Sequence, residues 1–255
     1  MIHALGIDLE DWYLDVASHA PRAARPAQAA LEHQIEVLRD ILDAASTRCT
    51  FFVLGATARR YPGLVRALAS DDHEIAAHGF HHRRLDHMTW SERRSDVARS
   101  FGTIGELVGA APLGYRAPYF SLDRVDPRER FYDLLHAAGF RYSSSCRLAA
   151  PRSEFAEFPV SSLRIGRYRV PVAGGGYWRI LPRRALLAII GRHERRGEPF
   201  AAYLHPHELD PRPLASSRPG EWLWVNLGRR SVRGKLQAVV GAFRFGAYRA
   251  RLAPW

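Results

Sequence analysis

Two short segments carry side chains that together could form a hydrolytic metal site. Residues 8–11 read Asp-Leu-Glu-Asp, and residues 78–82 read His-Gly-Phe-His-His. Carboxylate oxygens and imidazole nitrogens are ligands of catalytic zinc sites, which leave a further position open for water or substrate. An ion held in this way activates water and polarises carbonyl groups. The residue types therefore indicate metal-assisted hydrolysis.

The elements predicted around these segments would bring them together. Residues 2–7 form an apolar run that predicts a buried strand ending at Asp8, and residues 74–77 predict another that ends before His78. The carboxyl ends of parallel strands lie at one edge of an α/β sheet, where such folds place their active sites. Two histidines four residues apart are a weak signal alone, and this context strengthens it.

Strand and helix patterns alternate along the chain, which predicts an α/β fold with a largely parallel sheet or barrel. A loop rich in Pro and Ala at 20–27 precedes a long helix pattern with Leu31, Ile35, Leu38, Ile41 and Leu42 on one face. Further strands are expected at 50–54, 113–116, 140–144 and 200–205, and further helices at 56–69, 89–108, 127–138 and 183–196.

Two of these helices carry boundary signals. Pro62 lies inside the helix pattern at 56–69 and predicts a break there, because proline lacks the N–H that the helix needs. Thr89 and Glu92 have the spacing of a capping box, which predicts a helix start at that point. Gly109 is expected to end the same helix.

Length and composition favour one domain spanning residues 1–255. The chain has 255 residues, of which 47% are hydrophobic, and no break in composition divides it. The first residues lack a secretory pattern, and no apolar run approaches the ~18 residues of a spanning helix, so we expect a cytoplasmic protein. Cys49 and Cys146 are then expected to be reduced.

The chain is strongly basic, with a formal net charge of +11. Such a charge favours anionic partners, although an arginine-rich coding bias would produce it as well. Residues 229–251 combine seven basic side chains with apolar residues at near-helical spacing. This segment is either an amphipathic helix in peripheral contact with an anionic membrane surface or a final packing helix with a solvated basic face. No nucleic-acid-binding motif is present, and we expect no nucleic acid partner.

The segment 172–178 contains three consecutive glycines. Glycine permits close backbone approach, but the spacing is not that of a phosphate-binding loop, so we exclude nucleotide binding. Two interpretations remain open. The segment is a tight loop beside a substrate groove, with Tyr177 and Trp178 as a sugar-stacking wall, or it is a purely structural turn.

The order of these pieces resembles the NodB-like polysaccharide deacetylase family, which is carbohydrate esterase family four. The resemblance is strongest to the branch of exopolysaccharide-associated deacetylases and peptidoglycan deacetylase and allantoinase-like proteins. It covers nearly the whole chain, and six segments in order carry it: 6–12, 50–55, 73–82, 114–121, 171–177 and 205–211. The resemblance implies a distorted (β/α) barrel of about seven strands.

The resemblance also implies roles for single residues. His78 and His82 match the metal-binding histidines, and Arg116 matches the arginine that holds the catalytic aspartate. Tyr119 matches the residue whose backbone N–H faces the developing oxyanion. His205 matches the late histidine that acts as general acid.

The acidic segment can be matched to the family in two ways. In one, Asp8 is the catalytic base and Glu10 is the metal ligand; in the other, Glu10 and Asp11 form the adjacent pair and Asp11 is the ligand. Alternation along a strand places Asp8 and Glu10 on one face, which slightly favours the first. Ser143 is a second departure, because relatives often carry aspartate there; its absence would alter the support of the site without removing the ion.

The implied activity is a metal-dependent amidohydrolase that removes an N-acetyl or related N-acyl group from an amino sugar. The expected substrate is an amino-sugar or polysaccharide precursor in cell-surface polysaccharide (exopolysaccharide or O-antigen) biosynthesis. The expected cofactor is one divalent ion, zinc first, with cobalt, nickel or manganese as alternatives. Two alternatives stay open: a catalytically silent saccharide-binding member of the fold, and a hydrolase of another linear or cyclic amide.

Overall fold

One parallel sheet forms the centre of the computed structural model, which describes residues 1–12, 15, 29–147, 155–214 and 219–252. β1 (His3–Leu9) lies between β9 (Ala201–Leu204) and β2 (Thr50–Val53). The short strand β10 (Phe245–Gly246) pairs with the start of β1. Beyond β2 the sheet continues through β3 (Glu74–Ala77), β4 (Gly114–Tyr115), β5 (Tyr142–Ser143) and β6 (Ala156–Glu157).

The sheet curls into a half-barrel, which the segment after β6 helps to close. The Val160 N–H donates to the carbonyl of Cys146 after β5 (3.1 Å), and the Ser161 N–H donates to the carbonyl of Ala201 in β9 (3.1 Å). This segment therefore joins the two outer edges of the sheet. The prediction of a distorted barrel of about seven strands is confirmed.

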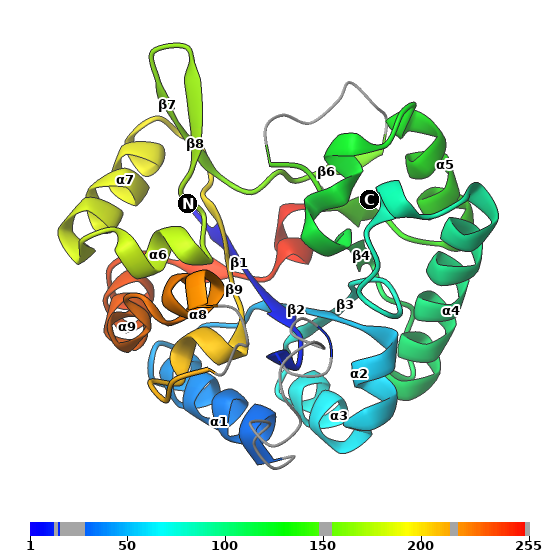
Figure 1. The fold of residues 1–255 in the computed structure, drawn as a ribbon, viewed down its shortest axis with the longest axis horizontal. Coiled ribbons are helices and arrows are strands. Elements are labelled where there is room, and N and C mark those ends of the chain that lie inside the picture. Colours follow the sequence, from blue (N-terminus) through cyan, green and yellow to red (C-terminus); the bar gives the residue numbers. More distant parts are fainter. Residues whose placement is uncertain (13–14, 16–28, 148–154, 215–218, 253–255) are drawn as a thin grey trace.

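Helices surround the curled sheet on its outer side (Figure 1). All seven residues of β1 are buried, as expected for a parallel strand covered on both faces. The five apolar residues expected on one face of the first helix are all buried in the core. The long covering helices are α1 (Ala29–Ala44), α4 (Trp90–Val108), α5 (Arg128–Ala138), α7 (Arg183–Arg195) and α9 (Val232–Ala242).

Both predicted helix boundaries are confirmed. The helix pattern at 56–69 breaks into α2 (Gly55–Arg60) and α3 (Pro62–Ser70), with the proline at the first position of the second helix. Thr89 and Glu92 form the reciprocal bonds of a capping box, and Gly109 ends α4 with a φ of 72°. The Pro- and Ala-rich loop at 20–27 lies outside the described residues.

The basic segment at 229–251 is helical mainly in α9, whose apolar side contacts the core; short 3-10 helices and β10 make up much of the rest. Leu236 and Val239 in α9 are fully buried. Lys235 is also buried, and its Nζ donates to the carbonyls of Trp178 (2.8 Å) and Arg179 (3.1 Å). These contacts match the packing interpretation of the segment. Within the described residues, no helix has the length and apolar character needed to cross a membrane.

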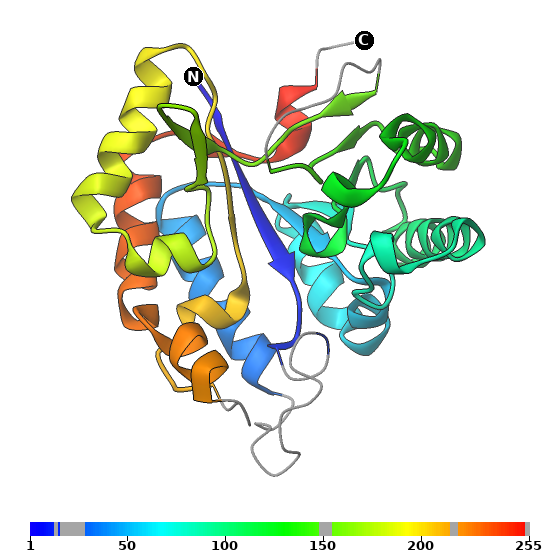
Figure 2. The ribbon, with the colours of Figure 1, turned by 45° about the horizontal axis from the view of Figure 1, so that its top comes forward.

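Three elements on one side of the barrel were not expected from the sequence. An antiparallel hairpin of β7 (Ser162–Ile165) and β8 (Tyr168–Pro171) projects from the sheet, as Figure 2 shows. The short helix α6 (Gly176–Ile180) follows it, and α8 (Pro219–Asn226) lies near α6. The two cysteines are buried and free, as expected.

His73 is a buried histidine that the fold keeps neutral. It precedes β3, and its Nδ1 accepts a hydrogen bond from the Cys49 N–H (3.2 Å). Burial, assisted by the nearby charge of Arg48, lowers the pKa of His73 from 6.5 to about 4. The unfolded chain therefore binds a proton between these two pH values that the folded chain does not bind, and stability rises with pH across that window.

We predict that the contribution of His73 to the free energy of unfolding falls as the pH is lowered from 6.5 towards 4. One such group contributes at most about 1.4 kcal/mol per pH unit. His73→Asn keeps an acceptor for the Cys49 N–H without titrating, so it should flatten this dependence in urea unfolding at several pH values. His33→Asn, at an exposed position on α1, is the control. Equal slopes for the two variants would contradict this role of His73.

Candidate active site

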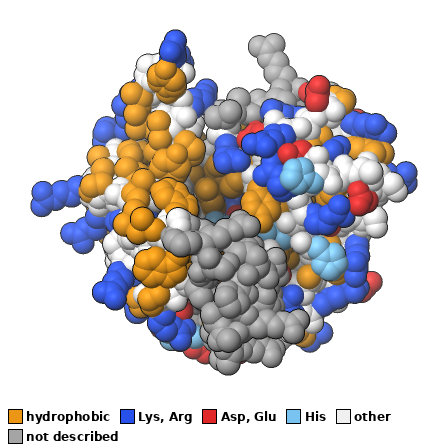
Figure 3. All heavy atoms as spheres, viewed as in Figure 1, with side chains coloured by type: hydrophobic (Ala, Val, Ile, Leu, Met, Phe, Trp, Pro, Cys, Tyr) orange, Lys and Arg blue, Asp and Glu red, His pale blue; other side chains and the backbone are white. Residues whose placement is uncertain are grey.

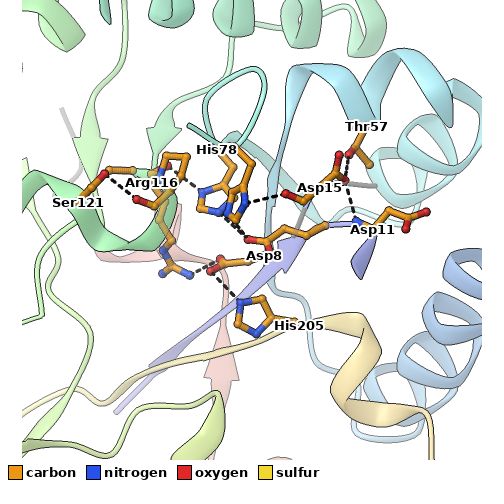
Figure 4. Close-up of polar contacts among 12 residues, drawn as sticks. Asp8, Asp11, Asp15, Thr57, His78, Arg116, Ser121 and His205 are labelled. Carbon is orange, nitrogen blue, oxygen red and sulfur yellow. Dashed lines mark hydrogen bonds and ion pairs between the residues drawn. The ribbon is translucent and has the colours of Figure 1, made fainter. Parts of the chain in front are cut away.

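The acidic segment and the histidine segment meet at the carboxyl edge of the sheet, as expected (Figure 4). Asp8 lies in β1, and Glu10 follows its end; both side chains are buried. His78 comes directly after β3, where its backbone N–H donates to the carbonyl of Val53 in β2 (2.9 Å). The parallel register of β1, β2 and β3 thus carries these side chains to one place.

Glu10 and the two predicted histidines form a compact group of ligand atoms. Glu10 Oε1 lies 2.9 Å from His78 Nε2 and 3.0 Å from His82 Nε2. The Nδ1 of His78 contacts the Arg116 carbonyl (2.8 Å), and the Nδ1 of His82 contacts the Asp15 carbonyl (3.3 Å). Because a carbonyl oxygen only accepts, each Nδ1 donates and each Nε2 is aimed at Glu10.

This group attracts positive charge, which is the property that a cation site requires. Burial alone would raise the pKa of Glu10, but the charges of His82 and His205 and the histidine hydrogen bonds hold it well below its usual range. Burial alone would lower the pKa of His82, but the facing Glu10 carboxylate raises it. The carboxylate and the facing imidazoles therefore stabilise positive charge between them. A divalent ion fits there, because the three ligand atoms lie within 4.8 Å of one another.

Asp11 is not brought into this group. Its carboxylate accepts a hydrogen bond from the Tyr61 hydroxyl (2.9 Å), and its N–H donates to Asp15 Oδ2 (2.8 Å). Figure 4 shows the Asp11 side chain turned away from the histidines. The reason is local, because the strand ends at Leu9 and the next residues begin a turn. Of the two rival ligands, the structure therefore places Glu10 beside the imidazoles.

Arg116 fixes the proposed base, Asp8. The guanidinium is fully buried, and its Nη1 donates to Asp8 Oδ1 (2.6 Å). Its Nη2 donates to the hydroxyls of Ser144 (2.8 Å) and Tyr248 (2.9 Å), and its Nε donates to the Ser144 carbonyl (3.1 Å). Ser143, where an aspartate was expected to matter, is not among these partners. The hydroxyls of Ser144 and Tyr248 support the arginine instead.

His205 follows β9 and lies on the other side of Asp8. Its Nε2 is 3.9 Å from Asp8 Oδ2, and its Nδ1 is 3.2 Å from Glu208 Oε2. Glu208 lies in the short 3-10 helix Pro206–Leu209, is buried, and has Oε1 3.5 Å from Arg179 Nε.

The carboxylates around His205 decide its protonation state. Burial would lower the pKa of His205, but the carboxylates of Glu10, Glu208 and Asp8 outweigh it and raise the pKa to about 9. Burial would raise the pKa of Glu208, but the hydrogen bond and charge of His205 lower it to about 2. At neutral pH the two form an ion pair. His205 can therefore present a proton towards Asp8 and the pocket.

The three candidate metal ligands lie with Asp8, His205 and Glu208 on the floor of an open pocket of about 440 Å³. Its walls include five aromatic side chains: Trp12, Tyr119, Phe120, Tyr203 and Trp224. The ring of Tyr119 lies 4.4 Å from that of His82, measured between centroids. A polar floor with aromatic walls can orient a ligand by hydrogen bonds and cover its apolar faces.

Local backbone strain is concentrated at this pocket. Five non-glycine residues in the described chain have a positive φ, and three of them line the pocket: His82 (55°), Tyr119 (58°) and Phe120 (53°). Each such conformation costs about 1–2 kcal/mol for an L-residue and persists only where the surrounding structure fixes it. Such outliers cluster at functional sites.

The prediction that Tyr177 and Trp178 form a sugar-stacking wall is wrong. Trp178 is fully buried in the core and cannot stack on a ligand, while Tyr177 is half-buried and does not line the pocket. Gly175 and Gly176 do line it, so the tight loop lies beside the groove. Trp224 on α8, which was not predicted from the sequence, lines the pocket with its aromatic ring instead.

Other residues of the site were also missed. Glu208 had a usable signal, because it stands three residues after His205 in one short segment. Ser144 and Tyr248 had none, because they lie 28 and 132 residues from Arg116 in the sequence.

Comparison with known proteins supports the assignment of the family. Residues 31–142 match the polysaccharide deacetylase family model, and residues 131–253 match a domain of unknown function, DUF3473. A peptidoglycan-N-acetylglucosamine deacetylase of Bacillus cereus is 31% identical over 80 residues, which is 31% of this chain and 29% of that protein. A chitin deacetylase of Colletotrichum lindemuthianum is 32% identical over 34% of this chain and 37% of its own length. The matched region thus spans about a third of these relatives.

Solved structures show the same fold. The peptidoglycan N-acetylglucosamine deacetylase Bc1960 covers 97% of this chain and 86% of its own, at 18% identity and a TM-score of 0.54. A family 4 carbohydrate esterase from Streptomyces lividans, solved with acetate, covers 96% of this chain and 91% of its own, at 15% identity and a TM-score of 0.52. The motifs, the curled parallel sheet and the match at 31–142 together make this chain similar to the polysaccharide deacetylase family.

Proposed function

We propose that this protein is a metal-dependent hydrolase that removes an N-acetyl or related N-acyl group from an amino sugar. One observation carries the proposal: the Glu10, His78 and His82 ligand group lies beside a buried carboxylate held by Arg116 and close to a histidine paired with Glu208. The names of the relatives, which act on peptidoglycan N-acetylglucosamine and on chitin, support an amino-sugar substrate. We place the reaction in cell-surface polysaccharide biosynthesis in the cytoplasm, on the sequence pattern alone.

The proposed chemistry assigns the first proton transfer to Asp8. A divalent ion held by Glu10, His78 and His82 would polarise the amide carbonyl and lower the pKa of bound water to about 7. Arg116 fixes the position of Asp8, whose carboxylate would accept a proton as water attacks the carbonyl carbon. We assign to the Tyr119 backbone N–H a hydrogen bond to the developing oxyanion, an interaction that can contribute about 3–4 kcal/mol.

The second proton transfer falls to His205. An amide nitrogen leaves poorly unless it is protonated, and the His205 imidazolium, stabilised by Glu208, can supply that proton. The 3.9 Å distance between His205 Nε2 and Asp8 Oδ2 places donor and acceptor beside the same space. Zinc is the ion that we propose, with cobalt, nickel and manganese as alternatives.

The ligand assignment is tested by metal content together with acetate release. We predict that Glu10→Gln and His78→Ala bind zinc at least about 100-fold more weakly, because losing even a supporting partner of a metal ligand costs 10–100-fold. Both variants should stop releasing acetate from N-acetylglucosamine oligomers. Asp11→Asn is the matched control, and it should keep stoichiometric metal because its carboxylate is turned to Tyr61. Acetate release by a metal-free variant would contradict the proposal.

The same assay separates the alternatives. Acetate, formate and ureido products measured side by side distinguish an N-acetyl substrate from another linear or cyclic amide. Bound oligosaccharide without metal and without any product would identify a silent saccharide-binding member of the fold.

A separate prediction concerns His205 as proton donor. His205→Ala should lower kcat on an N-acetyl sugar by about 10²–10⁴-fold, with metal content unchanged. On an activated aryl acetate the same variant should lose much less, because a phenolate leaves without a proton. Equal losses on both substrates would show that His205 acts at another step.

A further inference from the structure

Exposed apolar side chains gather on one face of the molecule. Nine large hydrophobic residues of the described chain are exposed, and seven of them lie on the β7–β8 hairpin, on α6, or in and just after α8. Figure 3 shows hydrophobic side chains massed over this side. We call these seven residues the apolar face: Ile165, Tyr168, Ile180, Trp222, Leu223, Trp224 and Leu227.

The apolar face is held in position rather than loosely attached. Arg179 in α6 donates to the backbone carbonyls of Trp224 (2.8 Å) and Val225 (2.5 Å), which fastens α8 to α6. Three consecutive residues, 222–224, are each at least 44% exposed. A helix on the surface of a water-soluble domain normally turns polar residues outwards. A clustered apolar patch of this kind marks an interaction surface.

The charge of the hairpin, α6 and most of α7 has one sign. Residues 158–193, which form the hairpin, α6 and most of α7, contain seven arginines and no aspartate or glutamate. Arg164, Arg167 and Arg169 on the hairpin are exposed, as are Arg183 and Arg184 at the start of α7. The surface that binds here must therefore be anionic as well as apolar.

We propose that the apolar face docks on an anionic membrane surface. Tryptophan and tyrosine prefer the boundary between headgroups and acyl chains, aliphatic side chains enter it, and arginines bind the lipid phosphates. A second copy of the chain fits poorly, because a symmetric pair would bring this arginine-rich surface against itself. A saccharide would use the aromatic rings but not Ile165 or Leu223, whose contacts suit acyl chains.

This surface differs from the one that the sequence suggested. The apolar side of α9 is buried in the core, whereas the apolar face is exposed and reaches the pocket through Trp224. The pocket therefore opens beside the proposed membrane contact. The inference does not depend on the proposed enzymatic activity, because lipid binding can be measured without saccharide or metal.

Co-sedimentation with lipid vesicles tests the inference. The full chain should bind vesicles of phosphatidylcholine mixed with phosphatidylglycerol, and bind much less to phosphatidylcholine alone or at high salt. The double variant I165D/L223D should lose at least about 10-fold in binding. Arg167→Glu should lose about 5- to 10-fold. Arg94→Glu has the same charge change at an exposed site on α4, across the molecule from the apolar face (Figure 1), and should bind like the wild type.

Each of these results would overturn the inference: no binding of the wild type to anionic vesicles, equal losses in Arg167→Glu and Arg94→Glu, or wild-type dimers that I165D/L223D dissociates without any change in vesicle binding. Circular dichroism and thermal unfolding confirm that each variant is folded. If the double variant fails to fold, the comparison of Arg167→Glu with Arg94→Glu decides alone. Displacement of the protein from vesicles by soluble oligosaccharide would assign the face to saccharide instead.

Discussion

The buried guanidinium of Arg116 is the constraint on which the site depends. Its guanidinium donates hydrogen bonds to Asp8 in the first strand and to Tyr248. Its backbone carbonyl accepts a hydrogen bond from His78 Nδ1. One residue therefore orients both the proposed base and a proposed metal ligand. Gly6 allows this arrangement, because a Cβ there would come within 2.9 Å of Nη1. Removing one partner of a buried ion pair typically costs about 3–5 kcal/mol, so the folding of the barrel and the geometry of the site are linked.

The electrostatics of the pocket follow from three buried carboxylates. Asp8 is balanced by Arg116, and Glu208 is balanced by His205 with Arg179 nearby. Glu10 contacts the imidazoles of His78 and His82. A buried carboxylate without a cation is strongly unfavourable, so this position recruits either a proton or a metal ion. A divalent ion is the form of positive charge that we propose for this position.

Local chemistry explains which features could be predicted from the sequence. The capping box at Thr89, the break at Pro62, the strand that carries Asp8 and the strand that ends before His78 depend on neighbouring residues, and each is observed; the first strand ends one residue later than predicted, at Leu9. The choice between Glu10 and Asp11 could not be made, because alternation stops where the strand ends. Trp178 was misplaced for a related reason: in a helix as short as α6, the sequence pattern does not show which residues face the core.

The pocket and the apolar face share Trp224, so substrate binding and membrane contact meet at one edge of the barrel. Glu10, His78 and His82 on the floor of that pocket are the proposed metal ligands. The most direct measurement is a crystal structure of the zinc-loaded protein with acetate, in which anomalous scattering locates the ion. We expect one peak about 2.0–2.2 Å from Glu10 Oε1 and from the Nε2 atoms of His78 and His82. A peak bound by Asp11, or no peak near the two histidines, would contradict the assignment.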